Sequence, residues 1–209
     1  MNHVKSRPIS DRKFTMDRYI KLKEHILGYL KARLPDNLYY HSYNHVIDVL
    51  GAAEFLAEKE GLSPITKELV KVAALFHDSG FTIEAREHEK LSCDIARELL
   101  PEFGYTLAEI ELIAAMIMAT KYPQSPTNLM EEIICDADLD YLGREDFFEI
   151  GGLLLTELNE SGRFKTEKDW NHFQEKFISS HKYFTKTAQE LREPKKLEHL
   201  KMIRESLKD

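Results

Sequence analysis

Four side chains in three separate segments are candidate metal ligands: His45, His77, Asp78 and Asp138. The apolar residues around them recur at helical spacing, which predicts that each of the four points toward the interior of the fold. A buried ionisable group is costly unless it is paired or bound to a metal. A mixed set of imidazole and carboxylate ligands suits Mn²⁺, Fe²⁺, Co²⁺, Ni²⁺ or Zn²⁺. Because the set contains no thiolate, it argues against a closed structural zinc site.

Each of these side chains also has an ordinary structural interpretation. A single inward histidine is more often a hydrogen-bonded core residue than a ligand. A single inward aspartate often caps a helix or forms half of an ion pair. Neighbouring residues such as His77 and Asp78 point about 100° apart on a helix, yet two short side chains there can reach one ion. The combination of four inward ligands from three segments therefore favours a metal site.

Three aspartates follow one another closely in the segment that carries Asp138. Asp138 shares its helical face with apolar residues such as Ile134, whereas Asp136 and Asp140 continue a polar stripe that starts at Glu132. We therefore expect Asp138 to be the inward carboxylate, and the other two to be solvated or to support the ligands.

The elements that position these residues are predicted to be helices. The chain has 209 residues with only 9 Gly and 7 Pro. These are about 4% and 3% of the chain, below the roughly 7% and 5% of an average protein. The apolar periodicity predicts helices over 14–33, from Ser42 or Asn44 to Glu60, and over 64–78, 86–100, 107–120 and 128–142, then about three more. We expect the helix over 107–120 to be central because its second half is apolar almost all round. Pro194 is expected to kink or break the last helix.

Composition and length favour one all-α domain over residues 1–209, a single-domain helical bundle. The longest uncharged apolar run, 112–119, is far short of the roughly 18 residues of a membrane span. Residues 1–13 are polar and lack the apolar stretch of a signal peptide. With two cysteines and no disulfide framework, we expect a reducing cytoplasm. A formal net charge of −7 argues against nucleic acid as a partner but permits a small anionic substrate bound through a metal.

Three sequence motifs in order resemble the HD superfamily of metal-dependent phosphohydrolases. They are Tyr40–His45, Ala74–Gly80 with the His77–Asp78 doublet, and Asp136–Leu142 with an Ala-Asp-Leu context around Asp138. The resemblance covers about residues 37–143, which it identifies as an HD core followed by additional C-terminal helices over 144–209. It implies an all-α fold of the HD/PDEase type. It also implies that His45, His77, Asp78 and Asp138 ligate a divalent metal ion. The candidate ions are then Mn²⁺, Fe²⁺, Co²⁺, Ni²⁺, Zn²⁺ and Mg²⁺.

The resemblance further implies roles for three residues outside this ligand set. The Tyr-His-x-x-x-His opening is similar to that of cyclic-nucleotide phosphodiesterases, where the first histidine protonates the leaving oxygen, so His41 would be the general acid. His88 resembles an additional histidine placed near the substrate phosphate or a second metal. At the position where some binuclear relatives carry another histidine, this chain has Lys121, which could contact phosphate or be an ordinary solvated lysine. The chain departs from the family's two-metal pattern at that point.

The reaction that the resemblance implies is hydrolysis of a phosphomonoester or phosphodiester of a nucleotide or similar small molecule by metal-activated water. Asp78 or Asp138 could take the proton of the water, and His41 could supply one to the leaving group. The expected partner is a small phosphorylated substrate, without nucleic acid or membrane, and a homodimer is possible. Three alternatives stay open: a cyclic-nucleotide phosphodiesterase, a non-catalytic HD-fold module that binds a nucleotide or metal, and a helical interaction protein.

Four aromatic residues could line a pocket for a base, although aromatic residues at such positions are more often part of the core. They are Phe81, Tyr122, Phe147 and Phe148.

Overall fold

The fold was obtained as a computed structural model that describes residues 12–160 and 162–208. Within these ranges the chain forms helices and no strand, which confirms the all-α prediction. Most of the N-terminal stretch 1–13 lies outside the described residues. No described helix has both the length and the apolar character that a membrane crossing requires. The helices are α1 (Arg12–Arg33), α2 (Tyr43–Lys59), α3 (Pro64–Phe76), η1 (Ser79–Thr82), α4 (His88–Leu99), η2 (Leu100–Phe103), α5 (Leu107–Ala119), α6 (Leu129–Asp138), η3 (Asp140–Gly143), α7 (Phe147–Leu158), α8 (Glu167–Ser180), α9 (Lys186–Leu191) and α10 (Glu193–Ser206).

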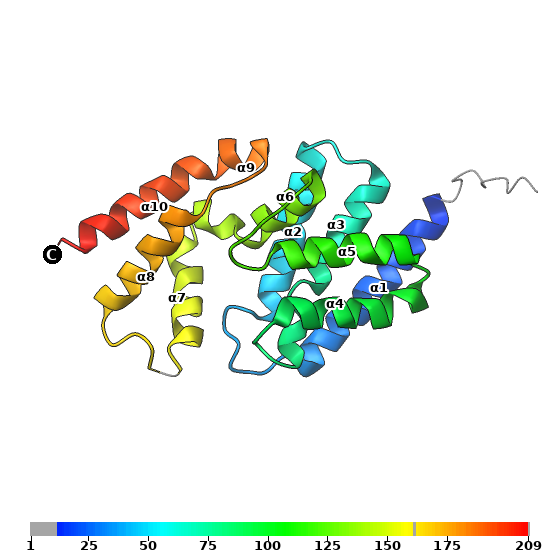
Figure 1. Cartoon of the computed structure of the whole chain (residues 1–209), viewed down its shortest axis with the longest axis horizontal. Helices are drawn as coiled ribbons and strands as arrows, with labels where there is room; N and C mark the ends of the chain where they lie inside the picture. The colour runs from blue at the N-terminus through cyan, green and yellow to red at the C-terminus, as the bar shows by residue number, and fades with distance from the viewer. Residues whose placement is uncertain (1–11, 161, 209) are drawn as a thin grey trace, which may run out of the picture.

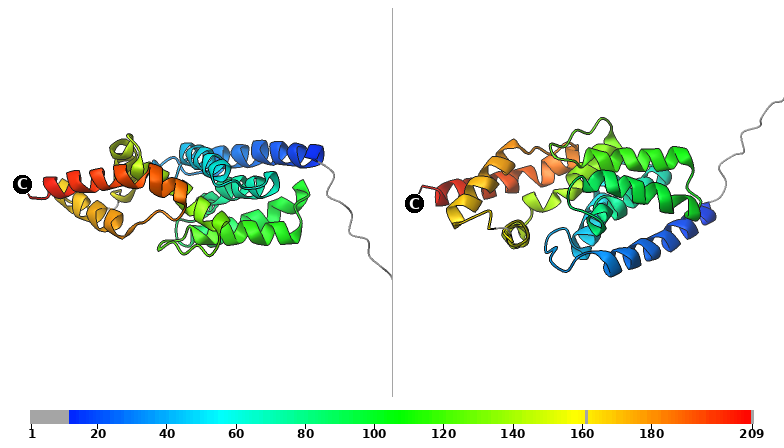
Figure 2. Two further views of the ribbon diagram at one scale, coloured as in Figure 1. Left: turned by 90° about the horizontal axis from the view of Figure 1, so that it is seen from above. Right: turned by 60° about the horizontal axis from the view of Figure 1, so that its bottom comes forward.

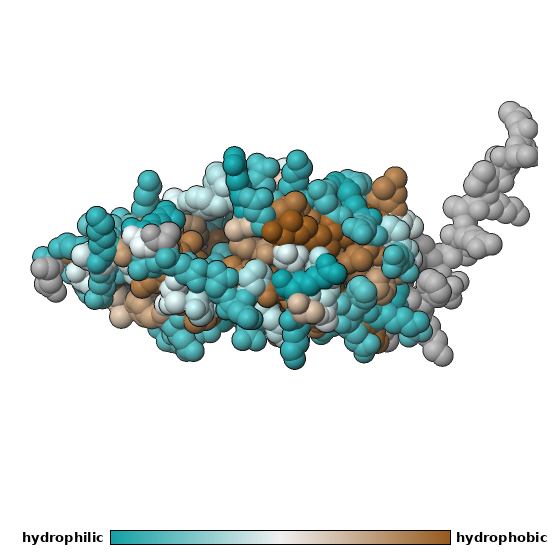
Figure 3. Space-filling model, turned by 90° about the horizontal axis from the view of Figure 1, so that it is seen from below, coloured by the Kyte–Doolittle hydropathy of each residue, from teal (hydrophilic) through white to brown (hydrophobic). Residues whose placement is uncertain are grey.

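Helices α1 to α6 pack together in one part of the molecule, and α7 to α10 lie at its other end (Figure 1). Two further views show α1 along one side of the first part and α4 and α5 along another, with α2 and α3 between them (Figure 2). The surface seen from below is mostly hydrophilic, with a dark hydrophobic patch near its middle and smaller hydrophobic areas elsewhere (Figure 3). The apolar faces of the helices are thus largely turned inward, as their periodicity predicts.

The central helix is α3, and the expectation that the helix over 107–120 is central was wrong. Helix α3 contacts α1, α2, α4, α5 and α6, and the residues from Val72 to Phe76 are fully buried. On α5, by contrast, Leu112 and Met118 are exposed. An apolar sequence on all sides therefore does not by itself place a helix in the centre.

Two helices end earlier than their sequence pattern predicts, and both ends carry candidate ligands. Helix α3 ends at Phe76 instead of Asp78, and the chain then turns into η1. Helix α6 ends at Asp138, and the predicted continuation to 142 is the short helix η3. The first of these turns requires a glycine at position 80, because a Cβ there would lie 2.1 Å from the carbonyl oxygen of His88.

The sequence predicts Asp136 and Asp140 to be solvated or to support the ligands, and the first of these alternatives was wrong, since both are buried. The carboxylate of Asp136 accepts hydrogen bonds from the backbone N–H groups of Phe184 (2.9 Å) and Thr185 (2.7 Å) and from the Thr185 hydroxyl (2.7 Å). Asp140 pairs with Arg192 Nε at 2.7 Å. The C-terminal segment covers this face of α6, and these two carboxylates anchor it.

The described residues of the C-terminal part form four helices, one more than the pattern predicts. Pro194 lies in the first turn of α10, where its missing N–H costs nothing, and the break falls just before it at Arg192. Helix α10 packs against α8, α9 and η3, whereas α7 contacts η3.

Candidate metal centre

The four predicted ligands meet where three helices converge. His45 lies in the first turn of α2, His77 and Asp78 directly follow α3, and Asp138 is the last residue of α6. These three helices contact one another pairwise. All four side chains are at least four-fifths shielded from solvent, and Asp138 is the most accessible of them, with 17% of its side chain exposed.

The polar atoms of the four residues point at one another. His45 Nε2 lies 3.4 Å from His77 Nε2 and 3.2 Å from Asp138 Oδ1. Asp78 Oδ2 lies 3.2 Å from His77 Nε2 and 3.5 Å from His45 Nε2. One ligand atom each from His45, His77 and Asp138 falls within 4.8 Å of the other two. Together these four side chains form the buried His/Asp cluster.

The tautomer of His77 shows why this cluster suits a cation. Its Nδ1 lies 2.9 Å from the carbonyl oxygen of Ala74, to which only an N–H can donate. The lone pair of the neutral ring is therefore on Nε2, which faces the other ligands, an arrangement typical of metal-binding histidines. Asp78 Oδ2 is buried and has no hydrogen-bond partner among the described residues. A lone pair and an unpartnered carboxylate oxygen that face each other fit a shared cation between them.

The electrostatics of the cluster lead to the same conclusion. Burial would raise the pKa of Asp78, but His77, His41 and His45 together outweigh burial and lower it. Burial would also raise the pKa of Asp138, but the hydrogen bonds with His45 and His77 lower it to about 2. Conversely, burial would lower the pKa of His77, but the carboxylates of Asp78 and Asp138 raise it well above its ordinary value. The two carboxylates thus stay ionised. Their negative charge stabilises a positive charge next to them, which a proton on His77 or a divalent cation can supply.

His88 and His41 lie beside the cluster. His88 Nε2 is 3.4 Å from Asp78 Oδ1, and His88 Nδ1 donates to the carbonyl oxygen of Ala85 at 3.1 Å. Phe81 contacts both imidazoles, with ring centroids 4.3 Å from His41 and 4.2 Å from His88. Of the four aromatic residues predicted for a base pocket, Phe81 therefore packs between two candidate site histidines.

The sequence analysis missed Glu157, which lies on α7 outside the three motifs. Its carboxylate accepts hydrogen bonds from the backbone N–H groups of Tyr40 (2.8 Å) and His41 (3.0 Å), and from the Nδ1–H of His41. Burial would lower the pKa of His41, but the hydrogen bond with Glu157 and the nearby charge of Asp78 raise it. The only sequence signal for Glu157 is a lone carboxylate in the apolar run 153–158.

The structure leaves the role of Lys121 untested. Its side chain is exposed, and within residues 12–160 and 162–208 its ammonium group makes no ion pair. A contact between Lys121 and phosphate stays a prediction.

Comparison with protein families and curated proteins locates the region of similarity. A family model described as the HD domain matches residues 42–140. An uncharacterized protein of Clostridium beijerinckii is 30% identical over 88 residues, which are 41% of this chain and 55% of that relative. The chain thus spans only about half the length of this relative.

Two solved structures share the fold over nearly the whole chain. Bacillus subtilis YpgQ in complex with ADP aligns with a TM-score of 0.65 and 21% identity, over 92% of this chain and 96% of YpgQ. A predicted HD superfamily hydrolase from an uncultured Thermotogales bacterium aligns with a TM-score of 0.61 and 20% identity, over 88% of this chain and 90% of that one. At these identities the similarity establishes the architecture, including the C-terminal helices outside the matched domain.

Proposed function

This chain is an HD-domain protein, and from that premise we propose that it is a metal-dependent phosphohydrolase that cleaves a small phosphate ester. The observation that carries the proposal is the buried His/Asp cluster, in which two imidazole Nε2 atoms lie 3.4 Å apart with carboxylate oxygens beside both. Such a set of nitrogen and oxygen ligands from His45, His77, Asp78 and Asp138 would hold one divalent cation of the Mn²⁺, Fe²⁺, Co²⁺, Ni²⁺, Zn²⁺ or Mg²⁺ group.

A cation bound there supplies Lewis-acid chemistry, since it polarises a phosphoryl oxygen and makes water a better nucleophile near neutral pH. The remaining steps belong to side chains. The carboxylate of Asp78 or Asp138 takes the proton that the attacking water loses as its oxygen bonds to phosphorus. His88, which faces Asp78 Oδ1, is placed to hold that carboxylate or a phosphate oxygen.

The second proton transfer is assigned to His41. Its Nδ1–H is held by Glu157, which leaves Nε2 as the nitrogen available to the substrate. As the bond between phosphorus and the leaving oxygen breaks, His41 donates a proton from Nε2 to that oxygen. General acid catalysis of this kind typically contributes about 10²–10⁴-fold. The raised pKa of His41 favours the protonated form that this role requires.

The substrate class we propose is a nucleotide or a similar phosphorylated small molecule. The solved relative YpgQ, captured in complex with ADP, supports this class. The net charge of −7 does not attract an anion, so a bound cation would have to attract the phosphate.

The experiment is a substrate screen on protein stripped with a chelator and reloaded with each metal in turn. Nucleoside mono-, di- and triphosphates, cyclic nucleotides and sugar phosphates are assayed for release of phosphate or of the cleaved ester. Metal-dependent turnover of any class supports the proposal, and turnover confined to cyclic nucleotides indicates a phosphodiesterase. Tight metal binding without turnover of any class would instead indicate a non-catalytic module, and lack of metal binding would indicate a helical interaction protein.

A further inference from the structure

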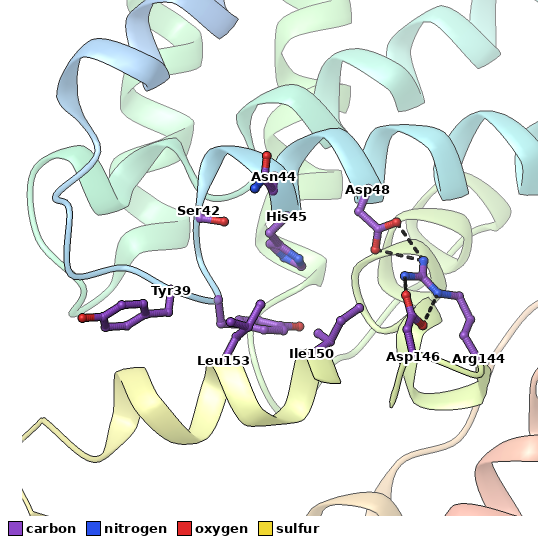
Figure 4. Close-up of a pocket in the computed structure, with 10 residues that line it drawn as sticks. Tyr39, Ser42, Asn44, His45, Asp48, Arg144, Asp146, Ile150 and Leu153 are labelled. Atoms are coloured by element: carbon purple, nitrogen blue, oxygen red, sulfur yellow. Dashed lines mark hydrogen bonds and ion pairs between the residues drawn. The ribbon is translucent and has the colours of Figure 1, made fainter. Parts of the chain in front are cut away.

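A second feature beside the cluster is a pocket between α2 and α7, which we call the α2–α7 pocket. Its volume is about 240 Å³. Its lining includes Tyr39, Tyr40 and His45, together with Ile150 and Leu153 of α7. Figure 4 shows His45 pointing from α2 toward Ile150 and Leu153. His45 therefore belongs to both the pocket and the buried His/Asp cluster, because it lines the pocket while its Nε2 lies 3.2 Å from Asp138 Oδ1.

Helix α7 places this pocket next to His41. Ile150, Leu153 and Glu157 follow one another at helical spacing and share one face of α7. Glu157 at the end of that stripe bonds the backbone N–H groups of Tyr40 and His41. A group seated against Leu153 thus lies one helical turn from Glu157, the residue that holds His41.

The chemistry of the walls favours an uncharged planar group. Tyr40 and His45 offer aromatic surface, with ring centroids 4.6 Å apart, whereas the Tyr39 ring extends away from the other lining residues (Figure 4). Ile150 and Leu153 offer aliphatic surface. An engineered apolar cavity of about 150 Å³ holds benzene, so 240 Å³ admits one ring system. The volume is below the roughly 300–1,000 Å³ of sites that enclose a whole drug-sized ligand.

The charges around the pocket argue against a phosphate group in it. Among the described lining residues Arg144 is the one arginine or lysine, and it is already paired with Asp48 at 2.8 Å and with Asp146 at 2.7 Å. Figure 4 shows this ion-pair group at one end of the pocket. With two carboxylates against one guanidinium, the wall would repel a second phosphate. A nucleotide would therefore place its phosphate at the cluster and an uncharged part in the pocket.

We infer that the α2–α7 pocket binds the aromatic or heteroaromatic ring of the substrate, such as a nucleobase, while the scissile phosphate lies at the cluster. This inference rests on the proposed phosphohydrolase function and adds a selectivity to it. The aromatic walls are Tyr40 and His45, and none of the four aromatic residues predicted from the sequence lines the pocket. Phosphate esters that carry a ring should consequently be preferred over esters without one.

The test uses a bulky substitution on each face of α7. Leu153→Trp fills the pocket from a position that is 43% exposed, so the core is not disturbed. Leu155→Trp is the matched control, because Leu155 lies on the same helix but lines a groove toward α8 and α10. We expect Leu153→Trp to lower the kcat/KM ratio of a nucleoside monophosphate over glycerol phosphate by about tenfold or more, as loss of apolar burial of one ring implies. Leu155→Trp should leave the ratio unchanged. An unchanged ratio in Leu153→Trp, or equal changes in both variants, would overturn the inference.

A binding experiment separates this inference from the proposed reaction. Adenosine and cytidine carry a ring but no phosphate, and saturation-transfer NMR detects their weak binding without any turnover. We expect a signal with the wild type and Leu155→Trp and its loss in Leu153→Trp. Absence of the signal in the wild type contradicts the pocket assignment even if phosphate esters are hydrolysed. A protein that binds the nucleosides but hydrolyses no ester keeps the pocket and loses the proposed function.

Discussion

Substitution of Glu157 by Gln tests whether α7 takes part in catalysis. The change keeps the size of the side chain and one oxygen that can accept the backbone N–H groups of Tyr40 and His41, which now lie 2.8 and 3.0 Å from the carboxylate. It removes the negative charge opposite the His41 Nδ1–H. A hydrogen bond to a charged group contributes about 1.5–3 kcal/mol. If that bond keeps His41 protonated, its loss corresponds to about 10–100-fold in the proton donation step.

The same free energy fixes the expected pH dependence. The pKa of His41 is raised in the folded protein, so the protonated form is present at low pH and lost as the pH rises through that pKa. One pKa unit corresponds to 1.36 kcal/mol. In Glu157→Gln the alkaline limb of the kcat/KM profile should therefore move to lower pH by about 1–2 units.

The assay compares an ester that needs a proton on its leaving group with one that does not. Hydrolysis of a nucleoside monophosphate by Glu157→Gln should fall about 10–100-fold, whereas 4-nitrophenyl phosphate should lose much less because its leaving group is already stable as an anion. Glu160→Gln is the control, since Glu160 bonds Asn37 in the same loop at 2.8 Å without contacting His41. Equal losses on both esters, with an unmoved alkaline limb, would refute the role assigned to Glu157.

Three further predictions concern the cluster and the turn that builds it. Asp78→Ala should weaken metal binding by more than the roughly 10–100-fold that loss of an outer-shell partner costs. The far-UV circular dichroism spectrum of the variant should stay helical. A folded variant with wild-type metal affinity would contradict the ligand assignment. Because the carboxylates raise the pKa of His77, metal binding near neutral pH should release about one proton. Titration calorimetry in buffers of different ionisation enthalpy measures that release, and a buffer-independent enthalpy would contradict it. Gly80→Ala should lower the free energy of unfolding by at least about 2 kcal/mol in urea, since its Cβ would meet the His88 carbonyl. Gly152→Ala should be neutral or stabilising, because outside the adjacent turns of its own helix no described atom lies within 4 Å of an added Cβ. Similar losses in both variants would refute the steric argument.

The sequence was sufficient to predict the four residues that the structure brings together. His45, His77, Asp78 and Asp138 interrupt apolar helical stripes, and a periodic pattern reports such positions directly because it is local. The helix ends around them were less predictable. Helix α3 ends before His77 because η1 brings Gly80 against α4. The periodicity along one helix does not report such a contact with another segment.

Long-range packing also explains the residues that the pattern misjudged or missed. Asp136 and Asp140 continue a polar stripe, so their sequence is typical of a solvated face, yet Thr185 and Arg192 approach them from about fifty residues away. Glu157 pairs with His41 across 116 residues. In each case one member of the pair lies in the C-terminal part, and one-dimensional patterns do not report which distant element covers a face.

The cluster residues and the residues around the pocket lie in different segments of the chain. All four cluster residues fall within residues 42–140, the segment that matches the HD domain. His41, Tyr39 and Tyr40 precede that segment, and Glu157 and Leu153 of α7 follow it. If the cluster acts on the phosphate and the flanking residues act on the leaving group, then similarity within the domain indicates the metal chemistry but leaves the substrate open. The substrate would then be determined by α7 and by the loop that Glu157 fixes, and exchange of these two elements between HD-domain proteins should transfer specificity while the cluster stays the same.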